Sequence, residues 1–562
     1  MAKKTIWSFG ITATALTFMS LPLVVSCASS GKKGVGQYVS SDIGDLQGQF
    51  NPGEAQNSKL IAEVARIRAS TDETAKTLLN QKTILITTGG KKNDKSFNQS
   101  VWEAISKFSR EVGQAENAFY ETSVISNSAQ FNAYEYALSK GYKFWFLTGF
   151  QQEGQLASWL QIGNNIERFK ANKTVVITVD WYPGDAPAAP NVLSQVRGHI
   201  LGLNFKTQEG GFVAAYSAAQ LLSEIHAEDP NQFPSGATYL NSFGGGDFSG
   251  VTNFNYGFYE GLRQFNEDMI AGTIFPNQAK YLVRATAPVE LSTGFAINNE
   301  SKAKAERQVD NQNPQVILPV AGSLTAVAID RARDKGRNQW VIGVDTDQSL
   351  AFPNDKGLLL TSVEKRIAVA TYKALLTVYG LTGYDASTSL LDNNHHLDAD
   401  RFILGSDGQK INFNSVGGYD EGFVGVSKST LDPQKFKFKT GTTYASRYDQ
   451  ITAATWASFF GNKKVQPNAL GRFEISVTDS KQHGLLPSDE VIQAFAEQMA
   501  GWPQIVTHDK NGNELSPAEK EQKMLEHLKA IFALKNVKKG FMTFSNQANF
   551  FAPVVKLINE QS

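Results

Sequence analysis

Between residues 82 and 378, short apolar runs alternate with longer amphipathic patterns, and this alternation constrains the fold more than any other feature of the chain. Such alternation is typical of parallel β-sheets covered by helices on both faces. The expected strands are Thr83–Thr87, Lys143–Leu147, Thr174–Val179, Gly198–Phe205, Ala237–Phe243, Lys280–Thr286, Gln315–Val320, Gln339–Val344 and Leu358–Thr361. The expected helices are Gln99–Val112, Gln130–Ser139, Gln152–Lys170, Glu209–Ile225, Val251–Met269, Leu324–Lys335 and Val363–Val378. Because one sheet would not comfortably hold so many strands, the pattern predicts an α/β protein with two lobes.

The N-terminus has the features of an export signal. Lys3 and Lys4 form a positive region before an apolar stretch over residues 6–25. Ser26 and Cys27, the only cysteine, follow in an arrangement that resembles a relaxed bacterial lipobox. Cleavage before Cys27 would let palmitate or a similar acyl chain anchor the protein at the outer face of the cell membrane. The alternative is an uncleaved anchor helix with an incidental cysteine, and both interpretations place the bulk of the chain outside the cytoplasm.

Charge balance and motif content exclude several classes of protein. The chain carries 54 basic and 54 acidic side chains, so it has no global field that would recruit nucleic acid. It lacks a Gly-x-Ser-x-Gly elbow, a His-Glu-x-x-His motif and the glycine-rich phosphate and dinucleotide loops. The histidines lack metal-ligand spacing, and His395 and His396 fall in a polar segment where they are expected to be solvated. We therefore expect neither an enzyme nor a bound cofactor or metal.

Polar loops after the expected strands are the places where a ligand would bind, because open α/β sheets bind ligands at the carboxyl ends of their strands. Phe97 stands in an otherwise polar loop, where it can stack on a planar ligand or pack as a hydrophobic staple. Asp180 ends a second strand and precedes two aromatic residues. Asp345 and Asp347 end a third strand. Their carboxylates are suited to bind ligand hydroxyls or a cation, and the alternative is that they cap the next turn. Lys365 is expected in the first turn of a helix. A cation there opposes the helix dipole, so its position indicates a role other than stabilising the helix.

Several segments, taken together and in order, resemble the basic membrane protein family of bacterial lipoproteins, the PnrA-like nucleoside-binding proteins of ABC transporters. The resemblance covers roughly residues 82–425, and the large size and relaxed lipobox resemble mollicute members of the family. It implies a type I periplasmic-binding-protein fold, with two doubly wound lobes and a ligand cleft between them. The segments that carry it are Asn93–Ser100, Glu209–Ala219, Tyr256–Gly261, Ala321–Gly322, Ile342–Gln348 and Thr361–Arg366.

The resemblance also assigns roles to individual residues. It implies that Phe97 stacks on the base, and that Asp345 and Lys365 hold the ribose hydroxyls. A departure occurs at Thr88, where nucleoside binders of this family commonly carry an aspartate that reads the base edge; sugar recognition is thus retained, while base recognition changes. A second stacking aromatic is not identifiable, although Phe295 is a candidate. Three further residues are expected at the cleft, namely Asn98, Asp180 and Gly322.

The chain is expected to divide into a signal peptide (residues 1–27), a flexible tether (28–57), a two-lobed binding domain (58–430) and a C-terminal extension (431–562). The expected function is that of a lipid-anchored solute-binding protein, with a nucleoside-like ligand and a membrane permease as partners. The alternative is a surface lipoprotein that binds a macromolecule through the C-terminal extension. A nucleoside hydrolase is a third hypothesis, but it would need a catalytic base or metal cluster that the sequence does not offer.

Overall fold

The computed structural model describes residues 79–476 with short gaps, together with Ser516, Val555, Ile558 and Asn559. The gaps are residues 89–91, 93–96, 115–117, 123–126, 184–190, 234–237, 276–280, 287–288, 335–338, 382–388, 420, 460–463 and 468–471. Cys27 and the tether over residues 28–57 lie outside the described residues. In the part of the chain that is described, no helix is both long enough and apolar enough to span a bilayer.

The first lobe is built on a six-stranded, all-parallel sheet with the order β13-β5-β4-β3-β1-β2. The central strands β3, β4 and β5 are rich in apolar and β-branched residues and are buried on both faces, as parallel strands covered by helices must be. The strands are β1 (Lys82–Ile86), β2 (Phe119–Thr122), β3 (Tyr142–Thr148), β4 (Val175–Val179), β5 (Ile200–Phe205) and β13 (Phe413–Gly417). The helices are α3 (Phe97–Val112), α4 (Asn127–Ser139), α5 (Gln152–Leu160), α6 (Asn165–Ala171), η3 (Asn191–Val196) and α12 (Ile367–Val378).

The second lobe holds an eight-stranded sheet with the order β15-β16-β14-β10-β9-β8-β6-β7, parallel from β10 to β7 and antiparallel from β10 to β15. The strands are β6 (Thr238–Gly244), β7 (Val283–Ala285), β8 (Val316–Val320), β9 (Trp340–Asp345), β10 (Leu359–Lys365), β14 (Val424–Ser427), β15 (Lys464–Pro467) and β16 (Arg472–Ser476). The helices are α7 (Thr207–Glu228), α8 (Ser249–Ala271), α9 (Asn299–Asp310), α10 (Leu324–Asp334), α11 (Gln348–Ala351), η4 (Lys356–Leu358) and α13 (Tyr444–Phe459). A small hairpin, β11 (His396–Leu397) with β12 (Ile403–Leu404), stands apart from both sheets.

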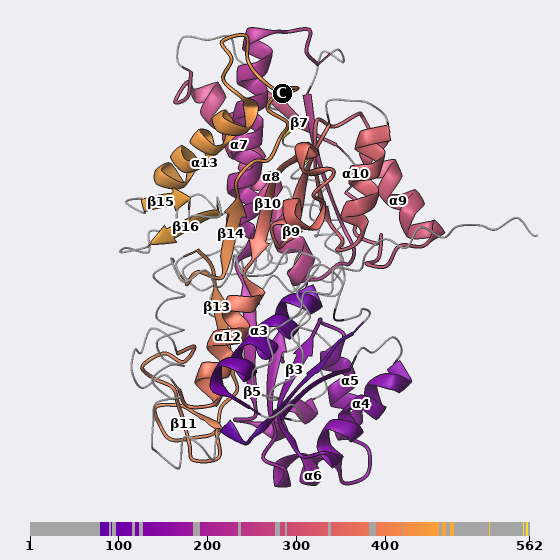
Figure 1. The fold of residues 1–562 in the computed structure, drawn as a ribbon, viewed down its shortest axis with the longest axis vertical. Helices are drawn as coiled ribbons and strands as arrows, with labels where there is room; N and C mark the ends of the chain where they lie inside the picture. The colour runs from indigo at the N-terminus through magenta and orange to yellow at the C-terminus, as the bar shows by residue number, and fades with distance from the viewer. Residues whose placement is uncertain are drawn as a thin grey trace, which may run out of the picture. The chain divides into compact units, whose positions relative to one another are not determined.

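The chain crosses between the lobes three times. It passes from β5 into α7, returns from β10 into α12, which packs beside α3, and passes again from β13 to β14 (Figure 1). Two α/β lobes joined by three crossovers form the type I periplasmic-binding-protein fold, so the predicted fold class is confirmed.

Glycines in two family-like segments hold the long helices of the second lobe together. A Cβ on Gly257 would lie 2.0 Å from the carbonyl oxygen of Gln208, and one on Gly261 would lie 2.1 Å from that of Phe212. A Cβ on Gly211 would lie 2.5 Å from the carbonyl oxygen of Phe254. The backbones of α7 and α8 therefore touch directly, which only glycine permits. The glycines of these two segments thus serve helix packing, and they do not line the cavity described below.

Two predicted helices begin or end differently from the expectation. The pattern over Gln152–Lys170 forms two helices, because the chain turns at Gly163, which has a φ of +55°. The helix expected from Val363 starts only at Ile367, because β10 continues through Lys365. Lys365 therefore ends a buried strand and does not oppose a helix dipole.

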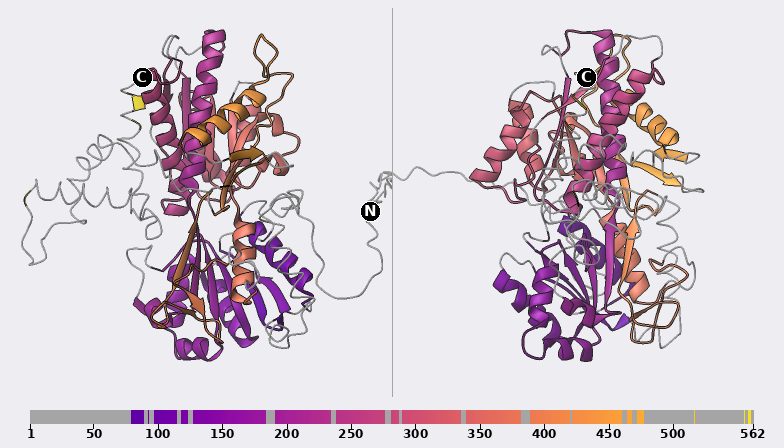
Figure 2. Two further views of the ribbon diagram at one scale, coloured as in Figure 1. Left: turned by 90° about the vertical axis from the view of Figure 1, so that its left-hand side faces the viewer. Right: turned by 180° about the vertical axis from the view of Figure 1, so that it is seen from behind.

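The folded lobe continues beyond residue 430, where we expected the binding domain to end. Helix α13 lies along α7 (Figures 1 and 2), and its Tyr448 is fully buried and donates a hydrogen bond to the carbonyl oxygen of Ala214. Farther along, Val555 and Ile558 join the same core, and Asn559 pairs with the backbone of Ala285 in β7. Parts of the predicted extension thus complete the second lobe.

Candidate functional site

A cavity of about 480 Å³ opens where strands of both lobes end, within the usual size range of small-ligand sites. All seven residues that the sequence singled out for ligand binding line it, although they are spread over nearly three hundred residues of chain. The lining residues are Thr88, Phe97, Asn98, Gly149, Phe150, Gln151, Asp180, Phe248, Gly250, Val251, Phe295, Ala296, Ile297, Val320, Gly322, Ser323, Val344, Asp345 and Lys365.

A buried ionic group, which we call the ionic pole, consists of Lys365, Asp180 and Asp345. The Lys365 ammonium donates to Asp180 Oδ2 at 2.8 Å and to the carbonyl oxygen of Gly250 at 3.0 Å. Its Nζ lies 3.7 Å from Asp345 Oδ1, and its side chain is only 3% exposed. Since Asp180 follows β4 and Lys365 ends β10, this ion pair joins the two lobes.

Aromatic rings surround the ammonium of the ionic pole. Lys365 Nζ lies 5.1 Å from the ring centroid of Phe254, 5.6 Å from that of Phe97 and 5.9 Å from that of Phe205. These distances fall within the range of cation–π attraction, which is stronger where water is excluded. The rings lower the local dielectric and so strengthen the attraction between Lys365 and both carboxylates.

Both acids of the ionic pole adopt the left-handed backbone conformation. Asp180 has a φ of +71° and Asp345 a φ of +66°, each directly at the end of a strand. Non-glycine residues in this region cost on the order of 1–3 kcal/mol and cluster at functional sites. The position of the Asp180 side chain also requires a glycine at residue 250, because a Cβ on Gly250 would lie 2.3 Å from Asp180 Oδ2. The local backbone therefore aims both carboxylates at Lys365.

Asp347 has a different role from Asp345, although the two are separated by one residue. Its carboxylate accepts hydrogen bonds from the backbone N–H of Ser349 at 3.1 Å and from the Ser349 hydroxyl at 2.7 Å, so it caps α11. The sequence placed both carboxylates on one face of a strand, but the left-handed turn at Asp345 separates them. Among the described residues, no three His, Cys, Asp or Glu side chains gather as metal ligands would.

Thr88 and Asn98 form a neutral polar corner of the cavity. The Thr88 hydroxyl donates to the carbonyl oxygen of Thr148 at 2.8 Å, and the Thr148 hydroxyl donates to Asn98 Oδ1 at 2.6 Å. With its proton committed, the Thr88 oxygen can offer a ligand only acceptor lone pairs. Thr88 thus keeps the acceptor chemistry of an aspartate without the charge.

Phe97, Phe150, Phe248 and Phe295 form an aromatic side of the cavity, of which the sequence singled out Phe97 and Phe295 and missed Phe150 and Phe248. Phe150 follows β3 in the first lobe and stacks on Phe248, which precedes α8 in the second, with ring centroids 3.6 Å apart. Phe295 lies 6.0 Å from Phe248 and is 39% exposed. The signal that identified Phe97, an aromatic residue in a polar or glycine-containing loop after a strand, also applies to Phe150 and Phe248.

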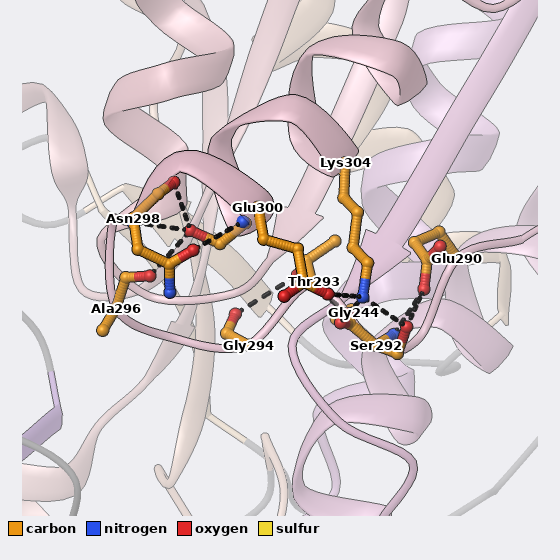
Figure 3. A network of polar contacts seen from close by, with 10 residues as sticks. Gly244, Glu290, Ser292, Thr293, Gly294, Ala296, Asn298, Glu300 and Lys304 are labelled. Atoms are coloured by element: carbon orange, nitrogen blue, oxygen red, sulfur yellow. Dashed lines mark hydrogen bonds and ion pairs between the residues drawn. The ribbon is translucent and has the colours of Figure 1, made fainter.

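The loop that carries Phe295 is fixed by polar contacts on both sides (Figure 3). On one side, Thr293 donates to the carbonyl oxygen of Gly244 at 3.0 Å, which ties the loop to the end of β6. On the other, Asn298 and Ser301 form a capping box that starts α9. Phe295 stands at the tip between these anchors, and the backbone carbonyl of Phe295 accepts from Ser323, which is next to Gly322. The loop is therefore held against the second lobe while its aromatic side chain faces the cavity.

Comparison with known proteins finds one matching family model and several similar proteins. Residues 286–380 match the family described as ABC transporter substrate-binding protein PnrA-like. Basic membrane protein A of Borreliella afzelii is 24% identical over 275 residues, which are 49% of this chain and 68% of that protein. Basic membrane protein A1 of Borrelia garinii subsp. bavariensis is 25% identical over 281 residues, which are 49% of this chain and 66% of that protein. The match thus spans about two thirds of the length of these relatives.

Two solved structures of ABC transporter solute-binding proteins also show similarity to this chain. One, from Aeropyrum pernix K1, has 18% identity and a TM-score of 0.42 and covers 68% of this chain and 87% of its own. Another, from Actinobacillus succinogenes 130z with bound D-allose, has 10% identity and a TM-score of 0.38 and covers 58% of this chain and 98% of its own. The matched family segment contains Gly322, Asp345 and Lys365 of the cavity. The chain is therefore similar to the PnrA-like, basic membrane protein family of ABC transporter substrate-binding proteins, and the family model matches it over residues 286–380.

Proposed function

We propose that this protein is a lipid-anchored, extracytoplasmic solute-binding protein that delivers nucleosides or closely related molecules to a membrane permease. The single observation that supports this best is the division of one cavity into an ionic pole and an aromatic side. A nucleoside has the same two chemistries, a polyhydroxyl sugar and a flat base.

In the proposed complex the ribose hydroxyls bind at the ionic pole. Asp345 would accept from hydroxyl groups, and Lys365 has a third N–H besides those given to Asp180 and Gly250. Hydrogen bonds to charged groups contribute about 1.5–3 kcal/mol each, which suits selection of a riboside over a free base. Because the pole is already assembled, little ordering of side chains would oppose binding.

The base would lie against the aromatic side. Stacking on one aromatic side chain is worth about 1–3 kcal/mol per base and does not distinguish one base from another. Thr88 offers the base edge an acceptor without charge, so it favours bases that present an N–H, but weakly. We therefore expect a binder that selects ribosides strongly and discriminates among bases weakly.

The experiment that tests this function compares ribosides with free bases. Full-length protein freed of co-purified ligand would be titrated calorimetrically with adenosine, guanosine, uridine, adenine and ribose. We expect Asp345→Asn to weaken the ribosides by about 1–3 kcal/mol, roughly 5- to 150-fold, and to change adenine binding little.

Asp347→Asn is the matched control, since it removes a carboxylate two residues away that caps α11. It should lower the free energy of unfolding by up to about 1 kcal/mol and leave riboside affinity unchanged. Equal losses for adenosine and adenine in Asp345→Asn, or no nucleoside binding by the unmodified protein, would contradict the proposal.

The anchor is tested separately at Cys27. Changing Cys27→Ala should abolish incorporation of labelled palmitate and leave the protein released or unprocessed, because the acyl chains supply the membrane affinity. Nucleoside affinity of the substituted protein should be unchanged. Incorporation of the label at the same level would exclude lipidation at this cysteine.

A further inference from the structure

A second cavity, of about 1300 Å³, lies in the first lobe and shares no residue with the cavity between the lobes. It is a groove between the segment Ser194–His199, which leads from η3 into β5, and the segment Asn394–Ile411, which contains the β11–β12 hairpin. None of the family-like sequence segments contributes to it. We name it the hairpin groove.

Backbone contacts build the hairpin groove. Gly198 has a φ of +83°, and a Cβ there would lie 3.0 Å from Lys410 Cβ and 3.2 Å from the carbonyl oxygen of Ile403. The backbone N–H of Ile403 donates to the carbonyl oxygen of Gly198 at 2.9 Å. Only glycine at position 198 lets the hairpin lie this close to the start of β5. The groove is therefore a fixed feature of the lobe.

His199 forms part of the wall of the groove and is only 3% exposed. Its Nδ1 lies 2.7 Å from the carbonyl oxygen of Thr174, so Nδ1 carries the proton and Nε2 is an acceptor. Its ring lies between Phe169 and Phe402, with centroid distances of 5.3 and 4.3 Å. Because His199 lines the groove, Nε2 can accept a hydrogen bond from a donor group of a ligand there.

Cations surround this neutral acceptor. Lys170, Arg197 and Lys410 line the groove, and Lys410 Nζ lies 3.8 Å from the ring centroid of Phe402. Burial, opposed by the hydrogen bond to Thr174 and assisted by the nearby ammonium groups of Lys410, Lys170 and Lys143, lowers the pKa of His199 to about 4, so the imidazole is neutral at neutral pH. The one acid of the lining, Asp407, is engaged by the backbone N–H of Gln409 at 3.0 Å. The groove thus combines positive charge with one neutral acceptor.

We propose that the hairpin groove binds a phosphate oxyanion that still carries a hydroxyl, with the cations Lys170, Arg197 and Lys410 on its charged oxygens and His199 Nε2 accepting from its P–OH. Cations alone would attract any oxyanion of similar size. The acceptor adds selectivity, because a site built to accept a hydrogen bond rejects an anion that has no proton to give. Inorganic phosphate keeps at least one proton at pH 7, whereas sulfate and the phosphodiester of a lipid headgroup keep none.

The test is a calorimetric titration of the full chain at pH 7 and constant ionic strength with inorganic phosphate, sulfate and phosphatidylglycerol vesicles. We expect phosphate to bind at least about tenfold more tightly than sulfate, and the vesicles to bind no better than sulfate. Equal affinity for phosphate and sulfate, preference for the vesicles, or no binding at all would overturn the proposal.

Two variants assign the roles of the groove residues. Lys410→Gln should weaken phosphate and sulfate alike, because it removes charge only. His199→Phe keeps an aromatic ring between Phe169 and Phe402 and should abolish the preference for phosphate. If His199→Phe does not fold, the ratio of the affinities of the unmodified protein for phosphate and sulfate still tests the proposal. Asp345→Asn is the control in the other cavity and should leave phosphate binding unchanged.

Discussion

The ionic pole and the aromatic side of the cavity between the lobes differ in how the protein holds them. Lys365 is 2% exposed and is paired with Asp180, whereas Phe150 and Phe295 are 37% and 39% exposed. The ionic pole is carried by the ends of β4, β9 and β10, and most of the aromatic side by loops. A site on strand ends is set by the register of the sheet, so it is more precise than a site on loops. We infer that the ionic pole fixes the position of the ligand and the aromatic side adapts to it.

The largest expected effect comes from removing the centre of the ionic pole. Lys365→Met leaves Asp180 buried without its ammonium partner, and breaking a buried pair in this way typically costs about 3–5 kcal/mol. We expect a loss of this size in the free energy of unfolding, measured by urea denaturation, together with loss of riboside binding.

Adding Asp180→Asn to Lys365→Met should recover much of the stability but none of the binding, because it removes the stranded charge and restores no donor. If the double variant is no more stable than the single one, Asp180 and Lys365 are not coupled as the 2.8 Å contact implies.

An intermediate effect is expected on the aromatic side. Phe97→Ala should weaken every nucleoside by about 1–3 kcal/mol and leave ribose binding unchanged, since only the base loses its stacking partner. Phe150→Ala should cost less, because its ring is partly exposed and already stacked on Phe248. Calorimetry with nucleosides and ribose checks both variants. A larger loss from Phe150 than from Phe97 would reverse the assignment of the stacking residue.

The smallest effect is expected at Thr88. Thr88→Val removes the hydroxyl that donates to Thr148 and accepts from the ligand, so affinity for bases with an N–H should fall by about 0.5–1.5 kcal/mol. Thr88→Ser keeps the hydroxyl and is the control. Thr88→Asp is not expected to strengthen recognition of the base edge, because the new carboxylate would face the carbonyl oxygen of Thr148, and two acceptors repel each other. Strong preference for one base in the unmodified protein would show that other residues read the base.

The local pattern of the sequence was sufficient to predict the layers of the fold. Buried strands such as Val175–Val179 consist of consecutive apolar and β-branched residues, and helices such as α8 show helical spacing, because these periodicities follow from backbone geometry. Phe97, Asp180, Asp345 and Lys365 could likewise be chosen from the sequence, because ligand groups follow strand ends in this class of fold. Thr88, Asn98 and Gly322 were implied only by the family resemblance. Their role in binding remains a prediction.

Tertiary structure alone decided which of these polar groups meet. The sequence treated Asp345 and Asp347 alike, and only the left-handed turn at Asp345 directs one to Lys365 and the other to the cap of α11. It placed Lys365 in a helix, because a strand that continues into a crossover has no local signal that distinguishes it from a helix start. It gave no sign that Phe150 would stack on Phe248 or that residues beyond 430 would complete the second lobe. Local periodicity determines the elements, but contacts between residues far apart in the chain depend on sheet order and the crossovers, and no short window of sequence contains that information.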